Sequence, residues 1–358
     1  MLWIEAVFRQ FAASSRGDSP ALHRLIRYAF VALGLALLGL VVANTDLGQV
    51  GGRLAQLGLF GAGAVLCLYL VAFALDTTVW QMTFVPRRPT LGWWLRLWEI
   101  KLIGEAVNNA TPLGSVGGEP VKALLLRKYL GVPLRDGAAS LVLAKTCVMV
   151  GLVLFLSTGF ALMLASERLP GPMKLVAGLG LIGFALAIAL LVAVQRFQLA
   201  SRVGGWIGRG WLKGGGERLR RWLDALNDMD RQLQAFYSSY IDRFFTAVLF
   251  STGNWLLGAV ELMVVMELFG RPIPFADAIA VEALAQLVRA GTFFIPLSLG
   301  AQEGTFMLAL GAITGAPALG LAVAFVRRAR ELLWLLLGLL MFWLVAGRPT
   351  HGSAPERG

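Results

Sequence analysis

The sequence is poor in the residues that build disulfide frameworks and metal sites. It contains two cysteines, Cys67 and Cys147, and both lie in apolar runs, so a structural disulfide is not expected. It contains two histidines, His23 and His351, which lie near the two ends of the chain. Because the sequence has no cluster of cysteine and histidine ligands, we expect neither a metal ion nor another cofactor.

Charged residues are also few, at 15% of the 358 residues, whereas 57% are hydrophobic. This composition is far more apolar than a soluble domain requires. Several runs approach the roughly 20 apolar residues that cross a bilayer. We expect no cleavable signal peptide, because the first apolar run starts near Tyr28 and no small-residue cleavage site follows it. The sequence therefore predicts an all-α, polytopic membrane protein.

The charges that are present are mainly positive, and the formal net charge is +11 at pH 7. The basic residues cluster beside the hydrophobic runs, which is typical of cytoplasmic loops next to anionic lipid. In residues 196–243 arginines alternate with tryptophans and tyrosines. This mixture predicts helices that lie in the headgroup layer and contact anionic lipid headgroups. We do not expect a nucleic-acid partner beside so many predicted spans.

The pattern divides the chain into three parts. Residues 1–27 are predicted to form a cytoplasmic or interfacial N-terminus, 28–346 a single transmembrane domain, and 347–358 a cytoplasmic tail. Since lysine and arginine concentrate in cytoplasmic loops, we expect both termini on the cytoplasmic side of a bacterial inner membrane. The apolar runs predict spans over about residues 28–43, 57–80, 137–164, 174–195, 244–267 and 320–346.

Two short motifs resemble each other. Residues 112–119 read Pro-Leu-Gly-Ser-Val-Gly-Gly-Glu, and residues 296–303 read Pro-Leu-Ser-Leu-Gly-Ala-Gln-Glu. The prolines of the two motifs are 184 positions apart, and so are the glutamates. The first motif interrupts a helix predicted over 91–110, and a second short helix is expected to begin at its glutamate. The second motif lies inside the stretch 275–315, which we also expect to be a broken helical pair.

The predicted spans around the motifs match by the same offset. They define repeat one, about 57–164, and repeat two, about 241–346. Charge placement puts the first broken segment at the cytoplasmic face and the second at the opposite face, with each entering and leaving on one side. The sequence therefore predicts inverted repeats, each containing a broken re-entrant helical hairpin, as in many transporters. Chance similarity between two stretches rich in glycine and leucine is the alternative.

The glutamates of the motifs have two interpretations. The helix that begins at Glu119 directs its first amide groups, which carry partial positive charge, toward the break. Glu119 and Glu303 are therefore either N-terminal caps or groups that carry a proton or hold a cation. Non-helical backbone at membrane depth is tolerated where it is buried in protein or lines a wet cavity, so both motifs are expected near such a cavity.

Ionisable residues inside predicted spans mark functional pathways by default. Lys145 lies well inside the predicted span 137–164, and Arg289 precedes the second motif by seven residues. A third group has helical spacing: Arg327, Arg328, Arg330 and Glu331. We expect the positive charges of all three groups to face one cavity near the two motifs, where arginine forks suit a phosphate group.

These observations predict a substrate-binding or translocation site built from both motifs and from the charges at membrane depth. Its candidate residues are Asn108, Asn109, Pro112, Gly117, Gly118, Glu119, Lys122, Lys145, Arg289, Pro296, Gly300, Gln302, Glu303, Arg327, Arg328, Arg330 and Glu331.

The motifs also carry a resemblance to a known family. The runs Asn108-Asn109-Ala110-Thr111-Pro112-Leu113-Gly114, Gly117-Gly118-Glu119-Pro120 and Leu299-Gly300-Ala301-Gln302-Glu303-Gly304 resemble the flippase-like transmembrane domain of lysylphosphatidylglycerol synthases. The resemblance covers roughly residues 25–346. In those synthases a soluble aminoacyl-transferase domain follows, for which we expect no room here, so the resemblance implies lipid translocation without synthesis. Residues 327–331 are similar to the stand-alone members associated with hopanoid biosynthesis.

The expected function is transport of a polar or anionic lipid between leaflets. We do not expect an enzyme, because no nucleophile–base pair is visible. Two alternatives stay open: an intramembrane lipid-modifying enzyme, since two carboxylates at a wet midplane suit acid–base chemistry, and a non-transporting partner of lipid biosynthesis enzymes, including those for hopanoids. The expected ligands are the lipid substrate and anionic lipid headgroups at the basic region. The sequence does not determine the oligomeric state.

Overall fold

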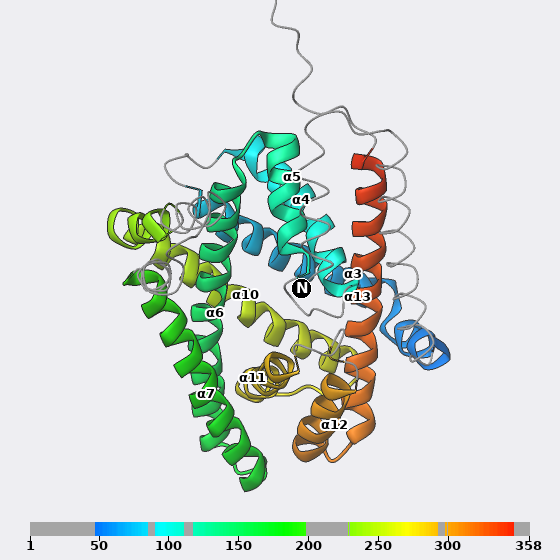
Figure 1. Ribbon diagram of the computed structural model, residues 1–358. Coiled ribbons are helices and arrows are strands. Elements are labelled where there is room, and N and C mark those ends of the chain that lie inside the picture. The colour runs from blue at the N-terminus through cyan, green and yellow to red at the C-terminus, as the bar shows by residue number, and fades with distance from the viewer. Residues whose placement is uncertain are drawn as a thin grey trace, which may run out of the picture.

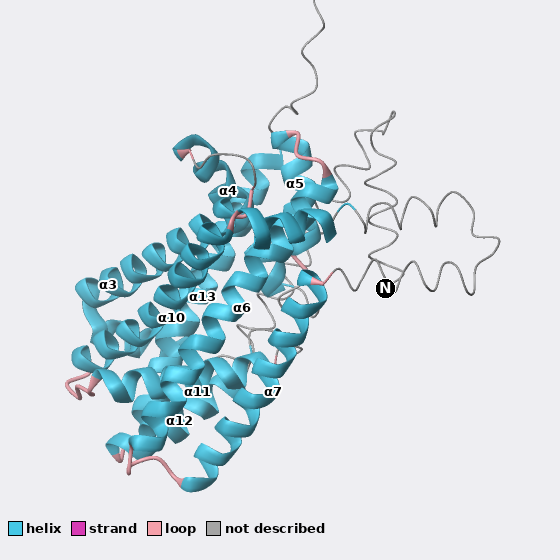
Figure 2. Cartoon of the chain, turned by 90° about the vertical axis from the view of Figure 1, so that its left-hand side faces the viewer, coloured by secondary structure: helices cyan, strands magenta, loops and turns pink. Residues whose placement is uncertain are grey.

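The computed structural model describes residues 47–84, 90–110, 117–197, 228, 230–292, 298 and 300–346. All regular structure in these ranges is helical, which confirms the all-α class (Figure 2). Several predictions lie outside the described residues: both terminal segments, the span predicted over 28–43, the motif prolines Pro112 and Pro296, and most of the basic region 196–243.

The first half contains α3 (Leu47–Met82), α4 (Leu91–Ala110), α5 (Glu119–Leu130) and α6 (Leu134–Ala165). The α3 helix bends at Gly58, whose φ of 67° is a conformation that glycine adopts without strain. The bounds of α4 and the start of α5 agree with the broken helix that the sequence predicts. Proline and glycine between them explain why the helix does not continue.

The second half contains α10 (Ile241–Leu268), α11 (Phe275–Gly291), α12 (Ala301–Thr314) and α13 (Pro317–Ala346). Between the halves lies α7 (Gly171–Arg196). Prolines precede or open several of these helices, where the missing N–H removes no helical hydrogen bond. The predicted broken stretch 275–315 is thus a pair of helices, as expected.

Four of the described helices are long and apolar enough to cross a membrane: α3 from Ala55 onward, α6, α7 and α10. They correspond to the spans predicted over 57–80, 137–164, 174–195 and 244–267. The α13 helix has 30 residues but carries charged side chains from Arg327 to Glu331, and it is not among the four. Only Ala177 and Gln195 of α7 are buried, as expected for a helix that faces lipid.

The helix contacts of the two halves correspond: a contact made by a helix of one half is repeated by the equivalent helix of the other half. The α3 helix packs against α10, α4 packs against α13, and α11 packs against α6, while α4 contacts α5 as α11 contacts α12. The α4–α5 pair lies at one end of the molecule and the α11–α12 pair at the opposite end (Figures 1 and 2). This arrangement agrees with two related units. The inverted insertion of these units and the re-entrant course of the pairs stay predictions.

Glycines let the helices of the two halves approach closely. A Cβ atom at Gly151 of α6 would lie 2.7 Å from the Ser251 side chain of α10. A side chain at Gly159 of α6 would overlap Ala283 of α11. Small residues at helix contacts are typical of membrane proteins, where close backbone approach replaces hydrophobic burial as the source of association.

Candidate functional site

The first polar cluster lies where α3, α4, α5 and α6 meet. Its three acids and three lysines line one cavity of about 60 Å³: Asp76, Lys101, Glu105, Glu119, Lys122 and Lys145. The apolar part of the lining includes Trp80 and three residues that share a face of α6 with Lys145: Leu141, Ala144 and Val148. A cavity of this size holds a few water molecules, so it is closed to a lipid headgroup in this conformation.

Two lysines of the first polar cluster are buried beneath carboxylates. Lys101 forms an ion pair with Asp76 and thereby joins α4 to α3. The Lys122 Nζ atom lies 2.6 Å from Glu105 Oε1 and 3.0 Å from Glu119 Oε1. The Lys122 side chain is 6% exposed, whereas that of Glu105 is 34% exposed. The polar wall of the cavity is therefore formed mainly by carboxylate oxygens.

The third lysine of this cluster is different. In the described part of the chain, Lys145 makes no hydrogen bond or ion pair, although it is partly buried and lines the cavity. An ammonium group in a partly dehydrated cavity favours a nearby anion. Among the described lysines of the cavity, Lys145 is therefore the one that no hydrogen bond or ion pair holds, although its charge acts on the nearby Glu105, and it can bind an anionic ligand.

Asn108 fixes the geometry of the junction between α4 and α5. Its Oδ1 atom accepts a hydrogen bond of 2.5 Å from the Gly118 N–H. Gly118 is buried against α4, and a side chain there would overlap the Gly104 carbonyl oxygen. Gly118 is also the N-cap of α5, and α5 has no side-chain cap. The capping interpretation of Glu119 is therefore wrong, because this side chain points to the cluster instead.

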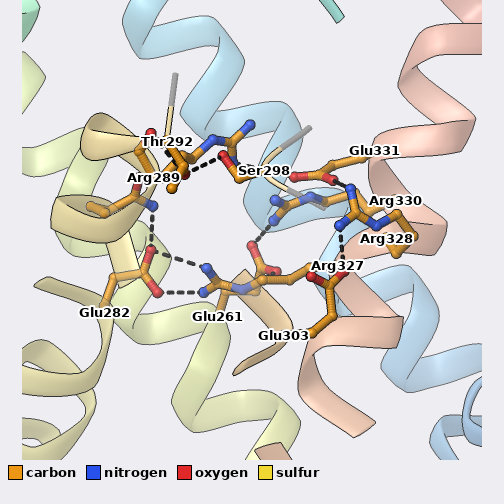
Figure 3. A network of polar contacts seen from close by, with 11 residues as sticks. Glu261, Glu282, Arg289, Thr292, Ser298, Glu303, Arg327, Arg328, Arg330 and Glu331 are labelled. Atoms are coloured by element: carbon orange, nitrogen blue, oxygen red, sulfur yellow. Dashed lines mark hydrogen bonds and ion pairs between the residues drawn. The ribbon is translucent and has the colours of Figure 1, made fainter. Parts of the chain in front are cut away.

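The second polar cluster lies among α10, α11, α12 and α13 (Figure 3). It contains four arginines and four glutamates: Arg289, Arg327, Arg328, Arg330, Glu261, Glu282, Glu303 and Glu331. The formal charges cancel within this cluster. Unlike the first, it is built on guanidinium groups, which bind carboxylates through a planar fork of donors.

Arg327 lies at the centre of the second polar cluster. Its Nη2 atom is 2.6 Å from Glu282 Oε2, and its Nε atom is 3.6 Å from Glu261 Oε1. Its guanidinium also donates to the Gly258 carbonyl oxygen at 3.0 Å and lies 4.8 Å from the ring centre of Phe306. The side chains of Arg327 and Glu261 are each 4% exposed. Arg327 thus connects α13 with α10, α11 and α12.

The remaining arginines are paired as well. Arg328 pairs with Glu303 and, at 3.0 Å, with Glu331. Arg289 lies 3.2 Å from the same Glu331, and Arg330 pairs with a glutamate of α10. Buried charges are tolerated where such partners neutralise them, which is the physical reason that these arginines are engaged.

Glu303 has a role that its counterpart Glu119 lacks. Its Oε2 atom accepts a hydrogen bond of 2.8 Å from the Gly300 N–H, and its Oε1 atom pairs with Arg328. Glu303 therefore caps α12 and holds an ion pair at the same time. Gly300 has a φ of 81°, which explains why a glycine stands at this turn.

An aromatic layer made of Tyr69, Phe73 and Trp334 contacts both clusters. The Arg330 guanidinium lies 4.2 Å from the ring centre of Tyr69, and Lys101 Nζ lies 5.2 Å from that of Phe73. The ring centroids of Tyr69 and Phe73 are 4.8 Å and 5.9 Å from that of Trp334. Cation–π contacts therefore connect this layer to one cation of each cluster.

The described residues of the predicted site belong to two clusters. Lys145 lines the cavity of the first polar cluster, whereas the four predicted arginines lie in the second and, among the described residues, do not line this cavity. Among the described residues, Lys145 and the four arginines thus belong to separate clusters, and the expectation that they face one cavity stays a prediction. The first cluster includes or adjoins Asn108, Gly118, Glu119, Lys122 and Lys145, and the second includes Arg289, Glu303, Arg327, Arg328, Arg330 and Glu331.

The other candidates lie around these clusters or outside the described residues. Asn109 is near the end of α4, and Gly117 immediately precedes the buried Gly118. Gly300 and Gln302 are at the start of α12, and the Oε1 atom of Gln302 is buried without a hydrogen-bond partner. Pro112 and Pro296 are not described.

The sequence reasoning left several cluster residues out of the predicted site. They are Asp76, Lys101 and Glu105 of the first cluster and Glu261 and Glu282 of the second. The signal for Glu282 is an acid in the middle of an alanine-rich apolar helix, seven residues before Arg289 and on the same helix face. An ionisable residue in that setting indicates a partner or a function.

Comparison with known proteins agrees with this architecture. Residues 25–339 match the family described as Lysylphosphatidylglycerol synthase TM region. The chain belongs to this family. It is also similar to a UPF0104 membrane protein of Methanothermobacter thermautotrophicus, with 24% identity over 345 residues that cover 90% of this chain and 95% of that protein. No solved structure matches.

Membership of the lysylphosphatidylglycerol synthase TM family confirms a multi-pass integral membrane protein. It also confirms the resemblance drawn from the two motifs, because the matched region contains both. The matched region includes every residue of the two polar clusters as well.

Proposed function

We propose that this chain moves a polar or anionic lipid between the leaflets of the bacterial inner membrane, with both termini in the cytoplasm. The observation that carries the proposal is the Lys145 ammonium, which forms no ion pair with the described residues and lines a polar cavity between two helices of spanning length, α3 and α6. A soluble-protein role would not explain a charged cavity within such an apolar chain. The description of the family, which concerns lipid synthases, supports a lipid substrate.

In this proposal the two clusters have different tasks. Lys145 receives the phosphate of the headgroup, and the carboxylates around it contact the rest of the headgroup. The second polar cluster holds α10, α11, α12 and α13 together as one body, because Arg327 contacts the other three helices. The body then moves against the first half, and the cavity widens to admit a headgroup.

The matching helix contacts of the two halves support alternating access by two related units. The α4–α5 and α11–α12 pairs at opposite ends of the molecule suit gates that open to opposite leaflets. The aromatic layer of Tyr69, Phe73 and Trp334 contacts a cation of each cluster, so it is the proposed barrier between them.

A leaflet-selective assay tests the proposal. The full-length protein is reconstituted in vesicles that contain a fluorescent anionic phospholipid or, in a parallel preparation, a fluorescent zwitterionic phospholipid, and a membrane-impermeant quencher reports how fast the inner-leaflet lipid becomes accessible. Vesicles with protein should expose this lipid faster than protein-free vesicles. Lys145→Gln should lower the rate about tenfold, since a charged hydrogen bond contributes about 1.5–3 kcal/mol. Equal rates with and without protein would contradict transport.

The matched control is Lys128→Gln. Lys128 is a lysine of α5 that does not line the cavity. The variant therefore removes one positive charge from the same half of the molecule and should keep the wild-type rate. A similar loss in both variants would assign the effect to overall charge and not to the cavity.

The two alternative functions predict different results. A lipid-modifying enzyme would convert a labelled lipid to a new product in detergent, using the carboxylates and lysines of the first polar cluster as acids and bases. A non-transporting partner would co-purify with a biosynthetic enzyme and would not increase lipid exchange by itself.

A further inference from the structure

The charges around the first cavity are not distributed evenly among the ion pairs. Lys101 has one carboxylate partner, Asp76, whereas Lys122 has two, Glu105 and Glu119. Lys145 has none in the described ranges. After each buried lysine is matched with one carboxylate, one carboxylate and one ammonium group are left on the wall of the same cavity.

Glu119 is the carboxylate in excess. Its Oε1 atom is 3.0 Å from Lys122 Nζ, farther than the 2.6 Å to Glu105, and Lys122 therefore stays neutralised when Glu119 turns to another partner. Glu119 does not cap α5, so the helix end does not require its carboxylate either. Unlike Glu303, it therefore has only the contact of Oε1 with Lys122 to exchange.

The two unmatched groups, Glu119 and Lys145, favour ligand groups of opposite charge. Glu119 favours a cation that donates hydrogen bonds, and Lys145 favours an anion. They are on different helices, α5 and α6, on the wall of one cavity. A ligand that carries only negative charge would satisfy Lys145 but would bring its charge close to Glu119, the carboxylate in excess on the same wall. A ligand with both charges satisfies both groups.

The geometry points to a zwitterionic lipid headgroup, in which a phosphodiester contacts Lys145 and a primary ammonium group contacts Glu119. The apolar α6 face formed by Leu141, Ala144 and Val148 beside Lys145 lies next to the glycerol and acyl portion of this lipid. This inference rests on the proposed function, because that function makes the ligand a membrane lipid, and it narrows the substrate class. The binding can nevertheless be measured without transport.

Native mass spectrometry of the full-length protein in detergent tests this. The probes are equal amounts of a phosphatidylethanolamine, which has both charges, and a phosphatidylglycerol with the same acyl chains, which has only the phosphate. The wild type should retain the ethanolamine lipid about tenfold more than the glycerol lipid. Equal retention, or preference for the glycerol lipid, would overturn the inference.

Two variants separate the two contacts. Glu119→Gln should lower the ratio of ethanolamine to glycerol lipid about tenfold, toward one, because it removes the partner of the ammonium group. Lys145→Gln should lower the retention of both lipids about tenfold and leave their ratio above one. Lys128→Gln is the control and should keep wild-type retention and ratio. A Glu119→Gln variant that folds and keeps the wild-type ratio would contradict the assignment.

The source of the headgroup is tested in a parallel sample. Soluble glycerophosphoethanolamine has the same headgroup without acyl chains. Retention of the lipid but not of the soluble compound supports a membrane ligand, whereas retention of the soluble compound alone would overturn it. Selective lipid retention without any leaflet exchange in vesicles would reject the proposed transport and keep this site. Leaflet exchange with no selectivity would reject the zwitterion and keep transport.

Discussion

The two polar clusters use similar numbers of charges in opposite ways. The first has lysines, a cavity and one cation, Lys145, that forms no ion pair with the residues that the structure describes. The second has arginines, and each guanidinium is paired with a glutamate. The exposure of the carboxylates differs accordingly: those of the first cluster are 22–34% exposed, whereas those of the second are 1–18% exposed. The difference indicates that one cluster is arranged to exchange partners and the other to hold helices together.

The largest effect on stability is expected when Arg327, at the centre of the second polar cluster, is replaced. Arg327→Met leaves Glu282 buried without its cation, which should lower the free energy of unfolding by about 3–5 kcal/mol. Thermal unfolding in detergent, followed by tryptophan fluorescence, measures this loss. The control is Arg96→Met, because Arg96 is exposed and pairs only within its helix, so less than about 1 kcal/mol is expected. Equal melting temperatures for both variants would contradict the holding role.

The next prediction compares the loss of stability when each of the two motif glutamates is replaced. Glu303→Gln weakens both the cap on Gly300 and the pair with Arg328, and should cost about 1.5–3 kcal/mol of stability. Glu119→Gln should change stability by less than about 0.5 kcal/mol, since Lys122 keeps Glu105. The same thermal measurement applies. If Glu119→Gln were the more destabilising of the two, Glu119 would be a structural residue and not an exchangeable one.

A smaller effect on stability is expected for two glycines, Gly118 in the first motif and Gly304 directly after the second. Gly118→Ala places a methyl group against the Gly104 carbonyl oxygen and should cost about 1–3 kcal/mol. Gly304→Ala, within α12, meets open space and should gain about 0.5–1 kcal/mol. A lower melting temperature for Gly118→Ala together with a higher one for Gly304→Ala would support tight packing at the first motif alone. A neutral Gly118→Ala would indicate that α4 and α5 are less tightly packed than described.

The inverted insertion of the halves is tested by labelling and requires no change in stability. Single cysteines replace Ser115 and Leu299 in a background where Cys67 and Cys147 are alanine. A membrane-impermeant maleimide should label Ser115→Cys from the cytoplasmic face and Leu299→Cys from the opposite face, as the charge pattern predicts. Labelling of both from one face would contradict inverted repeats.

The sequence predicted helices well and ion pairs poorly. Apolar runs and the Pro/Gly interruptions predicted α4, the start of α5 and the pair α11–α12, because these signals are local. The pairing of Arg327 with Glu282 and of Arg330 with Glu261 joins residues 45 and 69 positions apart. Periodicity within one helix contains no information on such partners. The sequence therefore identified cations at membrane depth but assigned the paired arginines, like Lys145, to the headgroup.

The distinction between Lys145 and the arginines is the central claim, and one measurement tests it directly. Leaflet exchange and thermal unfolding are measured on the same preparations of Lys145→Gln and Arg289→Gln, each removing one cation that the sequence assigned to the headgroup. The account predicts that Lys145→Gln lowers exchange about tenfold with an unchanged melting temperature, while Arg289→Gln lowers the melting temperature and reduces exchange less than Lys145→Gln does. Wild-type exchange by a folded Lys145→Gln protein would contradict the account.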